Sequence, residues 1–307
     1  RQLGLGVSGR YKSPLMQIGF FDDLYQYHIP RFQARWVDAE NFIHSTLELA
    51  CLERELFPFL KAQLSKLSHK GTIDFSDVPV RLTEAYVAAF RSPKSVGAYA
   101  RDFWLVQTGL DSGAAGAIFQ VLKNESTELD SCEVIRRAID LASTPDDKIK
   151  LEQIERVEPF LAECALLFSL MIADRDHAVD TVAESWTQSY QRSETYLSDL
   201  AARAGHVALL PMIAGTEAGR RFTALQKAAN AGSVADQIRA LAKYQSKVMQ
   251  GRRQPAWLSI EDGGQIKVHA RTSAAPKPER RPPGTWYNDY YLSHFRNLVK
   301  GFEGVGP

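Results

Sequence analysis

The stretch LAECALLFSLMIA, residues 161–173, is the longest apolar run in the sequence, and Glu163 is its one charged residue. The run is too short to cross a bilayer, because a transmembrane helix needs about 20 apolar residues. A helix that is apolar on every side is buried in a protein core. The stretch therefore predicts a fully buried helix, and we expect no membrane association.

The composition is that of a globular protein. The 307 residues are 45% hydrophobic and 24% charged, which allows a sizeable core in one large domain or two ordinary ones. Three cysteines lie far apart and do not suggest a disulfide framework: Cys51, Cys132 and Cys164. Reduced cysteines, and an opening without a basic and then apolar leader, lead us to expect a cytoplasmic protein.

Charge is distributed unevenly along the chain, although the net charge is only +1. Residues 124–187 contain 15 acidic and 6 basic side chains, a balance of −9. Residues 238–307 contain 12 basic and 5 acidic side chains, a balance of +7. Such an uneven charge distribution affects the electrostatic potential at the protein surface and the choice of binding partners, and it does not determine the fold.

Helical periodicity dominates most of the chain. One long helix is expected to begin at Asp38 as its N-cap, to kink or break at Pro58 and to end at Gly71. Two helices, each with a Ser or Thr N-cap and a terminal glycine, are expected over 216–232 and 233–251. Further helices are expected at about 82–90, 95–108, 113–123, 132–142, 146–157, 159–173, 178–204 and 206–212.

The sequence AWLSIEDGGQIKVHA, residues 256–270, has an alternating pattern. Leu258 and Ile260 precede an Asp-Gly-Gly turn, and Ile266 and Val268 follow it. Alternation with period two on both sides of a glycine turn predicts a β-hairpin. One face of the hairpin should pack on helices, because a lone hairpin is marginal in water.

The sequence TSAAPKPERRPPG, residues 272–284, has the composition of a linker. It leads to WYNDYYLSHFRNLVKGF, residues 286–302, which predicts an amphipathic helix. We expect the apolar stripe of this helix to dock on the protein's own body or on a partner. The stripe consists of Tyr287, Tyr291, Phe295, Leu298 and Phe302.

These patterns predict a mainly α fold: a multi-helix bundle or irregular helical array with one late β-hairpin and a C-terminal amphipathic helix. A helical body is expected over residues 1–231. A basic C-terminal unit is expected over residues 232–307, where it would contain a helix, the hairpin, the proline-rich linker and the terminal helix.

The glycines of LGLGVSGRYKS, residues 3–13, have the Gly-x-Gly-x-x-Gly spacing of a dinucleotide loop. Such a loop follows a strand, and only three residues precede Gly4. The P-loop alternative fails because two residues separate Gly9 from Lys12. We expect a flexible segment that binds no nucleotide or dinucleotide, and no cofactor is indicated elsewhere.

The sequence ADRDHAVD, residues 173–180, places Asp174, Asp176 and His177 directly after the apolar run. Such groups suit a divalent metal or acid–base chemistry. Aspartates at a helix junction also cap the next helix. Because the spacing matches no metal motif, capping is the main interpretation and no metal site is expected.

Basic side chains gather near the C-terminal end, with Trp257, Trp286 and Tyr290 among them. Lys and Arg release counterions from phosphates and aromatic rings stack on bases, so nucleic acid, including DNA, is a candidate partner. A solvated linker, or a basic tail docked on residues 124–187, explains the same pattern. The expected nucleic-acid-binding residues are Arg252, Arg253, Lys267, Arg271, Arg280, Arg281, Arg296 and Lys300.

These features favour a non-enzymatic interaction or scaffold component of a larger cytosolic assembly. We expect a protein partner, and we expect the basic C-terminal unit to contact that partner or a nucleic acid. The alternative function is a metal-dependent hydrolase or nuclease in which Asp174, Asp176 and His177 carry the chemistry.

Overall fold

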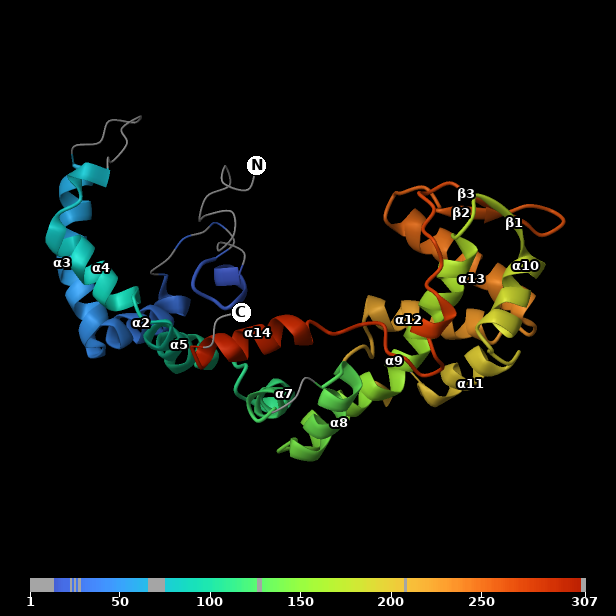
Figure 1. Cartoon of the computed structure of the whole chain (residues 1–307), viewed down its shortest axis with the longest axis horizontal. Helices are drawn as coiled ribbons and strands as arrows, with labels where there is room; N and C mark the ends of the chain where they lie inside the picture. The colour runs from blue at the N-terminus through green and yellow to red at the C-terminus, as the bar shows by residue number, and fades with distance from the viewer. Residues whose placement is uncertain are drawn as a thin grey trace. The chain divides into compact units, whose positions relative to one another are not determined.

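The protein is mainly α-helical, as the sequence predicts (Figure 1). A computed structural model describes residues 14–22, 24, 26, 29–65, 75–125, 129–206 and 209–304. That part of the chain contains thirteen α-helices and one small three-stranded antiparallel sheet. The glycine-rich segment 3–13 lies outside the described residues. No helix within the described ranges is both long and apolar enough to cross a membrane.

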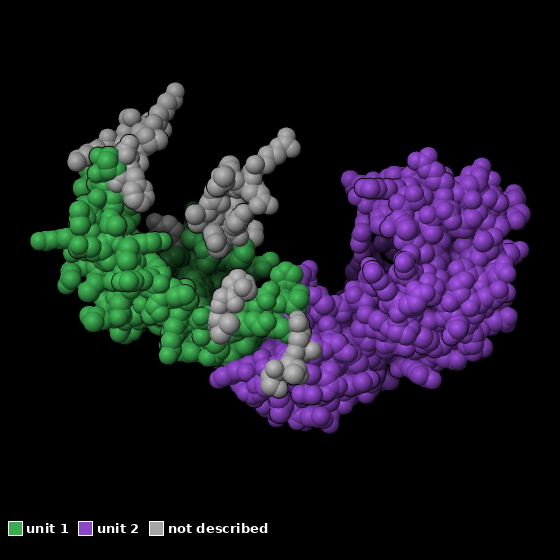
Figure 2. Space-filling model, in the orientation of Figure 1, with its two compact units in different colours: residues 1–119, 293–307 green, residues 120–292 purple. Residues whose placement is uncertain are grey.

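The chain divides into two compact units (Figure 2). Unit 1 comprises Arg1–Phe119 and Ser293–Pro307, and unit 2 comprises Gln120–Leu292. The boundary expected near residue 231 lies inside unit 2, between two helices that contribute to the same hydrophobic core.

Unit 1 is built from helices of the first part of the chain and from the last helix, α14. Its elements are α2 (Gln33–Ser45), α3 (Leu47–Leu64), α4 (Val80–Phe90), α5 (Pro93–Tyr99), the π-helical segment η4 (Ala100–Leu105), α6 (Val106–Thr108), most of α7 (Gly113–Lys123) and nearly all of α14 (Leu292–Phe302).

The helix expected to begin at Asp38 is wrong in its bounds. Asp38 lies inside α2, and the chain leaves the helical conformation at Thr46 (φ −102°, ψ 109°), so α2 and α3 are separate helices. Pro58 lies inside α3 without ending it. Leu56 before the proline and Phe59 after it both pack on the α3–α4 core, which holds the helix together although the proline lacks one backbone hydrogen bond. The expected end at Gly71 lies outside the described residues, and α3 ends at Leu64.

Unit 1 buries few apolar side chains. In the described part of the α3–α4 pair the buried hydrophobic residues are Leu52, Leu82 and Ala89. An aromatic cluster joins other segments of this unit: the rings of Phe20 and Trp36 lie 5.2 Å apart, edge to face. The Trp36 Nε1 also donates to the Phe20 carbonyl at 2.9 Å.

Unit 2 contains the larger hydrophobic core. Its elements are α8 (Ser131–Leu141), α9 (Pro145–Met171), β1 (Asp176–Ala178), α10 (Val179–Glu184), the π-helical segment η5 (Ser185–Ser189), α11 (Tyr196–Arg203), α12 (Glu217–Ala229), α13 (Val234–Gly251), β2 (Leu258–Ile260) and β3 (Gln265–Val268).

One helix, α9, replaces the two helices expected at 146–157 and 159–173. It begins with Thr144 as N-cap, whose hydroxyl accepts from Asp147 N at 3.2 Å. Pro159 does not break it. Tertiary packing explains this continuity, because the residues that follow Pro159 lie in the core. Their burial stabilises the helix by more than the loss of one backbone hydrogen bond destabilises it.

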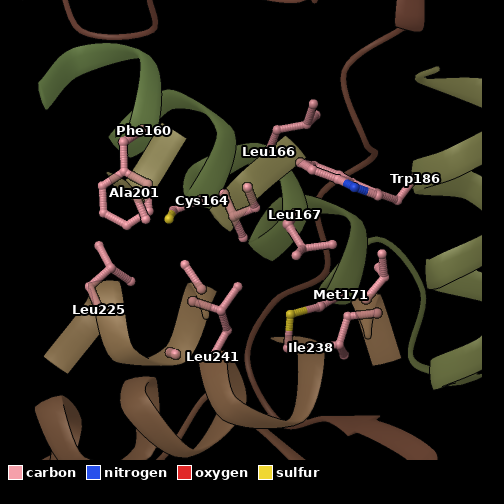
Figure 3. Close-up of a cluster of buried hydrophobic side chains, with 14 of the residues drawn as sticks. Phe160, Cys164, Leu166, Leu167, Met171, Trp186, Ala201, Leu225, Ile238 and Leu241 are labelled. Carbon is pink, nitrogen blue, oxygen red and sulfur yellow. The ribbon is translucent and has the colours of Figure 1, made fainter. Parts of the chain in front are cut away.

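The core of unit 2 lies between α9 and the α12–α13 pair (Figure 3). Side chains of α9, among them Phe160, Cys164 and Leu167, point toward Leu225 of α12 and Leu241 of α13. The stretch 161–173 is therefore a buried helix for most of its length, as expected. Burial in this apolar core raises the pKa of the Cys164 thiol well above its usual value.

The N-caps expected for α12 and α13 are confirmed. The Thr216 hydroxyl accepts from Gly219 N at 3.1 Å, and Ser233 forms a reciprocal capping box with Asp236. The single helix expected over 178–204 is wrong. It is divided into α10, η5 and α11, because the chain turns at Gln191, which adopts a left-handed conformation (φ 55°).

The expected β-hairpin is confirmed as β2 and β3, and it gains a third strand. Strand order is β1-β3-β2, and β1 pairs antiparallel with β3, with Asp176 opposite Lys267 and His177 opposite Ile266. Leu258 and Ile266 are buried against the helical core. The hairpin therefore packs its apolar face on helices, as its alternation predicts.

Candidate interaction surfaces

The Asp174–Asp176–His177 group does not form a metal centre in the described structure. Asp174 is an exposed loop residue, whereas Asp176 and His177 belong to β1. The Asp176 carboxylate accepts from the Gln265 amide of β3. No cluster of three or more His, Cys, Asp or Glu side chains suited to a metal occurs among the described residues. The expected capping of the next helix is also absent here, because α10 has Ala178 as N-cap without a side-chain hydrogen bond.

Lys267 is already paired on the surface of the sheet. Its Nζ lies 2.8 Å from Glu261 Oε1, and this hydrogen bond and ion pair raise the pKa of the lysine. An exposed pair of this kind contributes little to stability. It does lower the positive charge that Lys267 presents to a phosphate.

Arg252, Arg253 and Arg271 lie near the open end of the hairpin. Arg252 is the C-cap of α13, and Arg253 follows it in a left-handed conformation (φ 57°). The amides of His269 and Ala270 both donate to the Trp257 carbonyl, which brings the segment before Arg271 beside the segment after Arg253. Trp257 is 43% exposed at the same place.

Exposed cations without a carboxylate partner are concentrated in the later part of unit 2. Within the described residues, none of these side chains has an acidic group within the 4.0 Å of an ion pair. The group, called the cationic surface below, consists of Lys243, Lys247, Arg252, Arg253, Arg271, Lys277 and Arg280.

The expectation that Arg281 faces solvent is wrong. Arg281 is only 6% exposed, and its Nη2 donates to the Ala162 carbonyl of α9 at 2.7 Å. Its own carbonyl accepts from Arg192 at 2.9 Å, and Arg192 forms a bidentate pair with Glu163 at 2.7 and 2.9 Å. Arg281 therefore fastens the proline-rich linker to α9 instead of presenting a charge to a partner.

Arg296 and Lys300 belong to unit 1, because both lie on α14. Arg296 is half-buried and Lys300 is exposed. Of the eight expected nucleic-acid-binding residues, four therefore belong to the cationic surface. Lys267 is paired with Glu261, Arg281 is buried, and the other two residues belong to unit 1.

The apolar stripe expected from Tyr287 to Phe302 is not one helical face. Tyr290 and Tyr291 adopt left-handed conformations (φ 50° and 60°), so α14 begins only at Leu292. Tyr287 and Tyr291 are exposed, and Leu298 is 40% exposed. Phe302 is buried at 3% exposure, and Phe295 is half-buried. A different set of residues forms the buried face of α14: Leu292, Phe295, Val299 and Phe302.

The helix α14 docks on its own unit. The Phe119 ring lies 6.3 Å from Phe295 and 6.2 Å from Phe302. Gly97 of α5 faces the end of α14 so closely that a Cβ there would lie 2.4 Å from the Gly301 carbonyl oxygen. Of the two docking modes expected from the sequence, the structure shows an intramolecular one.

Glu158 of α9 holds the segment before α14 in place. This carboxylate is fully buried and accepts from the amides of Tyr287 and Asn288, both at 2.8 Å. It also accepts from the Asn288 side chain at 2.9 Å and from the Tyr290 hydroxyl at 2.6 Å. Burial, and then this hydrogen bond to Glu158, raise the pKa of Tyr290 far above its usual value.

The α3–α4 pair exposes apolar stripes that sequence reasoning did not single out. Phe57, Leu60 and Leu64 recur at helical spacing on α3, and Phe57 and Leu64 are 67% and 72% exposed. On α4, the rings of Tyr86 and Phe90 lie 5.0 Å apart, and both are exposed. The signal was present in the sequence, since these helices carry more apolar residues than one buried face requires.

Comparison of the chain with models of protein families, with curated proteins and with solved structures finds no match.

Proposed function

We propose that the protein is a non-enzymatic interaction component of a larger assembly, and that it docks a protein partner on the apolar surface of the α3–α4 pair. The distribution of exposed hydrophobic residues carries this proposal. Of the 21 large hydrophobic side chains exposed in the described residues, 14 belong to unit 1, which is the smaller unit. Large exposed apolar patches mark interaction sites in soluble proteins.

Helical geometry supports a protein partner at this surface. Residues at i, i+3 and i+7 form one stripe on a helix, which is the arrangement of Phe57, Leu60 and Leu64. An amphipathic helix buries such a stripe in a groove or against another helix. Because α3 already packs on α4 through Leu52, the stripe is a second apolar face that the α3–α4 pair leaves uncovered.

Gel filtration of native extract tests this function. The tagged full chain should elute within an assembly larger than one chain, and Phe57→Ser, Leu60→Ser and Leu64→Ser combined should shift it to the position of a single chain. A matched triple substitution on unit 2 should leave the assembly intact: Leu141→Ser, Ile149→Ser and Leu209→Ser, whose side chains are equally apolar and also exposed. Elution of the unmodified protein as a single chain would contradict the proposal.

A second function, nucleic-acid contact, is favoured by the cationic surface of unit 2. Among the described residues its side chains have no carboxylate partner. The exposed Trp257 follows Arg253 by four residues, and its carbonyl accepts from the segment that precedes Arg271. Phosphate contacts of Lys and Arg supply affinity through counterion release, and an aromatic ring adds base stacking. We infer a preference for single strands, whose bases are accessible to such a ring.

Fluorescence anisotropy with single-stranded and duplex DNA and RNA tests this function, at about 50 mM and about 200 mM salt. Binding should weaken steeply with salt and should be lost when Arg252 and Arg253 are changed to Gln. Arg136→Gln with Arg137→Gln removes the same charge from two arginines that are already paired with Glu155 and Glu133, so it should have little effect. Equal binding by the two double variants would contradict nucleic-acid contact at this surface.

A further inference from the structure

Unit 2 contains a half-open cavity of about 580 Å3 that no function above uses. It lies between α9 and α12, and its walls are largely apolar. The face of α9 contributes Ile154, Val157 and Leu161, and the facing side of α12 contributes Phe222 and Leu225. The lining also includes Glu217, Ala218, Arg221, Tyr244 and Tyr290.

The walls of this cavity are held in place by contacts outside it. Phe160 of α9 packs edge to face on Phe222 at 5.7 Å, which fixes α9 and α12 relative to each other. The Tyr290 ring is oriented by its hydrogen bond to Glu158. Gln153 Oε1 accepts from Met212 N at 3.0 Å and holds the loop beside the cavity. The cavity is therefore preformed, as small-molecule sites usually are.

Two arginines at or beside the cavity share one carboxylate. Glu217 is shared by two arginines: Arg220 approaches it at 2.6 and 2.9 Å, whereas Arg221 approaches it at 3.2 Å through Nε alone. Arg220 makes the larger contribution to lowering the pKa of Glu217. Two guanidinium groups therefore share one carboxylate, so the group of Glu217, Arg220 and Arg221 carries a net positive charge, and Arg221, the more weakly held of the two arginines, lines the cavity.

A second hydrogen-bond donor lies near Arg221. Tyr244 lines the cavity, and its hydroxyl has no hydrogen-bond partner among the described residues. Burial raises the pKa of Tyr244, and the nearby charges of Arg221 and Arg252 act in the opposite direction. A neutral phenol on the wall of the same cavity donates readily to an anion.

We propose that this cavity binds a linear aliphatic monocarboxylate, with its chain between α9 and α12 and its carboxylate on Arg221 and Tyr244. An apolar slot with a few convergent polar groups is the common design of small-molecule sites, and the volume lies within their usual range of about 300–1,000 Å3. Charge complementarity selects the head group, because two arginines that share one carboxylate leave a net positive charge, which favours an anion. The apolar lining residues of α9 recur at i, i+3 and i+7 (Ile154, Val157 and Leu161), so the apolar wall runs along the helix and suits an extended chain.

Isothermal titration calorimetry of the full chain with decanoate tests the proposal. One saturable site per chain is expected, with much weaker binding of decanol and of decyltrimethylammonium, which lack the carboxylate. Arg221→Gln should weaken decanoate binding about tenfold, because it removes a charge-assisted hydrogen bond. Arg221→Lys keeps the charge and should retain most of the affinity.

Two further variants separate the site from general effects of charge and stability. Lys227→Gln removes one positive charge from an exposed position on the same helix outside the cavity, so affinity should stay within about twofold. Ala218→Phe places a ring in the cavity and should abolish binding, with an unchanged unfolding temperature showing that the fold is intact. Equal affinity for decanoate and decanol, unchanged affinity in Arg221→Gln, or no saturable binding would overturn the proposal.

Discussion

At the scale of single residues, buried charge fastens the C-terminal linker to unit 2. Glu163 and Arg192 have side chains only 1% exposed, and Arg192 also donates to the Tyr190 and Arg281 carbonyls. Glu163 is the one charged residue in the longest apolar run of the sequence. Its presence in the core is explained by this bidentate partner, since a buried charge without a partner is very costly.

Removing one member of this buried pair should destabilise unit 2 strongly. We expect Arg192→Met to lower the free energy of unfolding by about 3–5 kcal/mol, because it leaves the Glu163 carboxylate buried without a cation. Urea denaturation followed by circular dichroism measures the change. The double variant Glu163→Leu, Arg192→Met should lose much less, and equal losses in the single and double variants would contradict this explanation.

The Tyr290–Glu158 hydrogen bond should make stability depend on pH in the alkaline range. The pKa of Tyr290 is raised in the folded protein, so its phenol stays protonated while that of the unfolded chain ionises above 10.0. Its contribution to stability is therefore complete below pH 10 and is lost as the pH rises further. Tyr290→Phe should cost about 1–3 kcal/mol at neutral pH, because Glu158 loses a donor.

The measurement for Tyr290 is urea unfolding of both proteins at about pH 8 and about pH 11. The unmodified protein should lose more stability between these pH values than Tyr290→Phe does. Identical pH dependence in the two proteins would show that another group causes the alkaline loss.

At the scale of elements, the close contact between Gly97 and α14 leaves no room for a side chain. A Cβ at Gly97 would lie 2.4 and 2.7 Å from the carbonyl oxygens of Gly301 and Phe302. We therefore expect Gly97→Ala to displace α14 from unit 1, with faster amide hydrogen exchange over 292–302. Gly301→Ala is the control, because a Cβ there meets no atom within 4 Å and should stabilise the helix slightly. Unchanged exchange in Gly97→Ala would contradict this packing.

Elements whose signals are local in sequence could be predicted, whereas those set by distant contacts could not. The hairpin and the N-cap at Ser233 depend on neighbouring residues, and the structure has both. The strand β1 was missed because three residues acquire strand structure only by pairing with β3. The start of α14 was misplaced because Glu158, distant in sequence, captures the amides of Tyr287 and Asn288.

The candidate surfaces, too, could be predicted only where their signals are local in sequence. The sequence located the basic end of the chain, and four of its eight expected contact residues belong to the cationic surface. Arg281 was predicted to belong to that surface because the composition of residues 272–284 is that of a solvated linker. Its burial depends on the Glu163–Arg192 pair and on the Ala162 carbonyl, and nothing in residues 272–284 reports these partners.

At the scale of the whole molecule, the two units differ in how completely they bury their apolar residues. Unit 2 has a continuous core that joins α9 to the α12–α13 pair and to the sheet. In unit 1, the α3–α4 pair buries three hydrophobic residues and exposes Phe57, Leu60 and Leu64 on one stripe. A helix pair with a small core and a second apolar face gains stability from a partner that covers that face.

Site-specific photocrosslinking in native extract tests this central claim most directly. A photoreactive phenylalanine at position 57 should form a discrete adduct with one protein partner. The same group at position 48 should not, because Glu48 is exposed on α3 half a turn around the helix from Phe57. No adduct at position 57, or equal adducts at both positions, would contradict the assignment of the α3–α4 stripe as a docking surface.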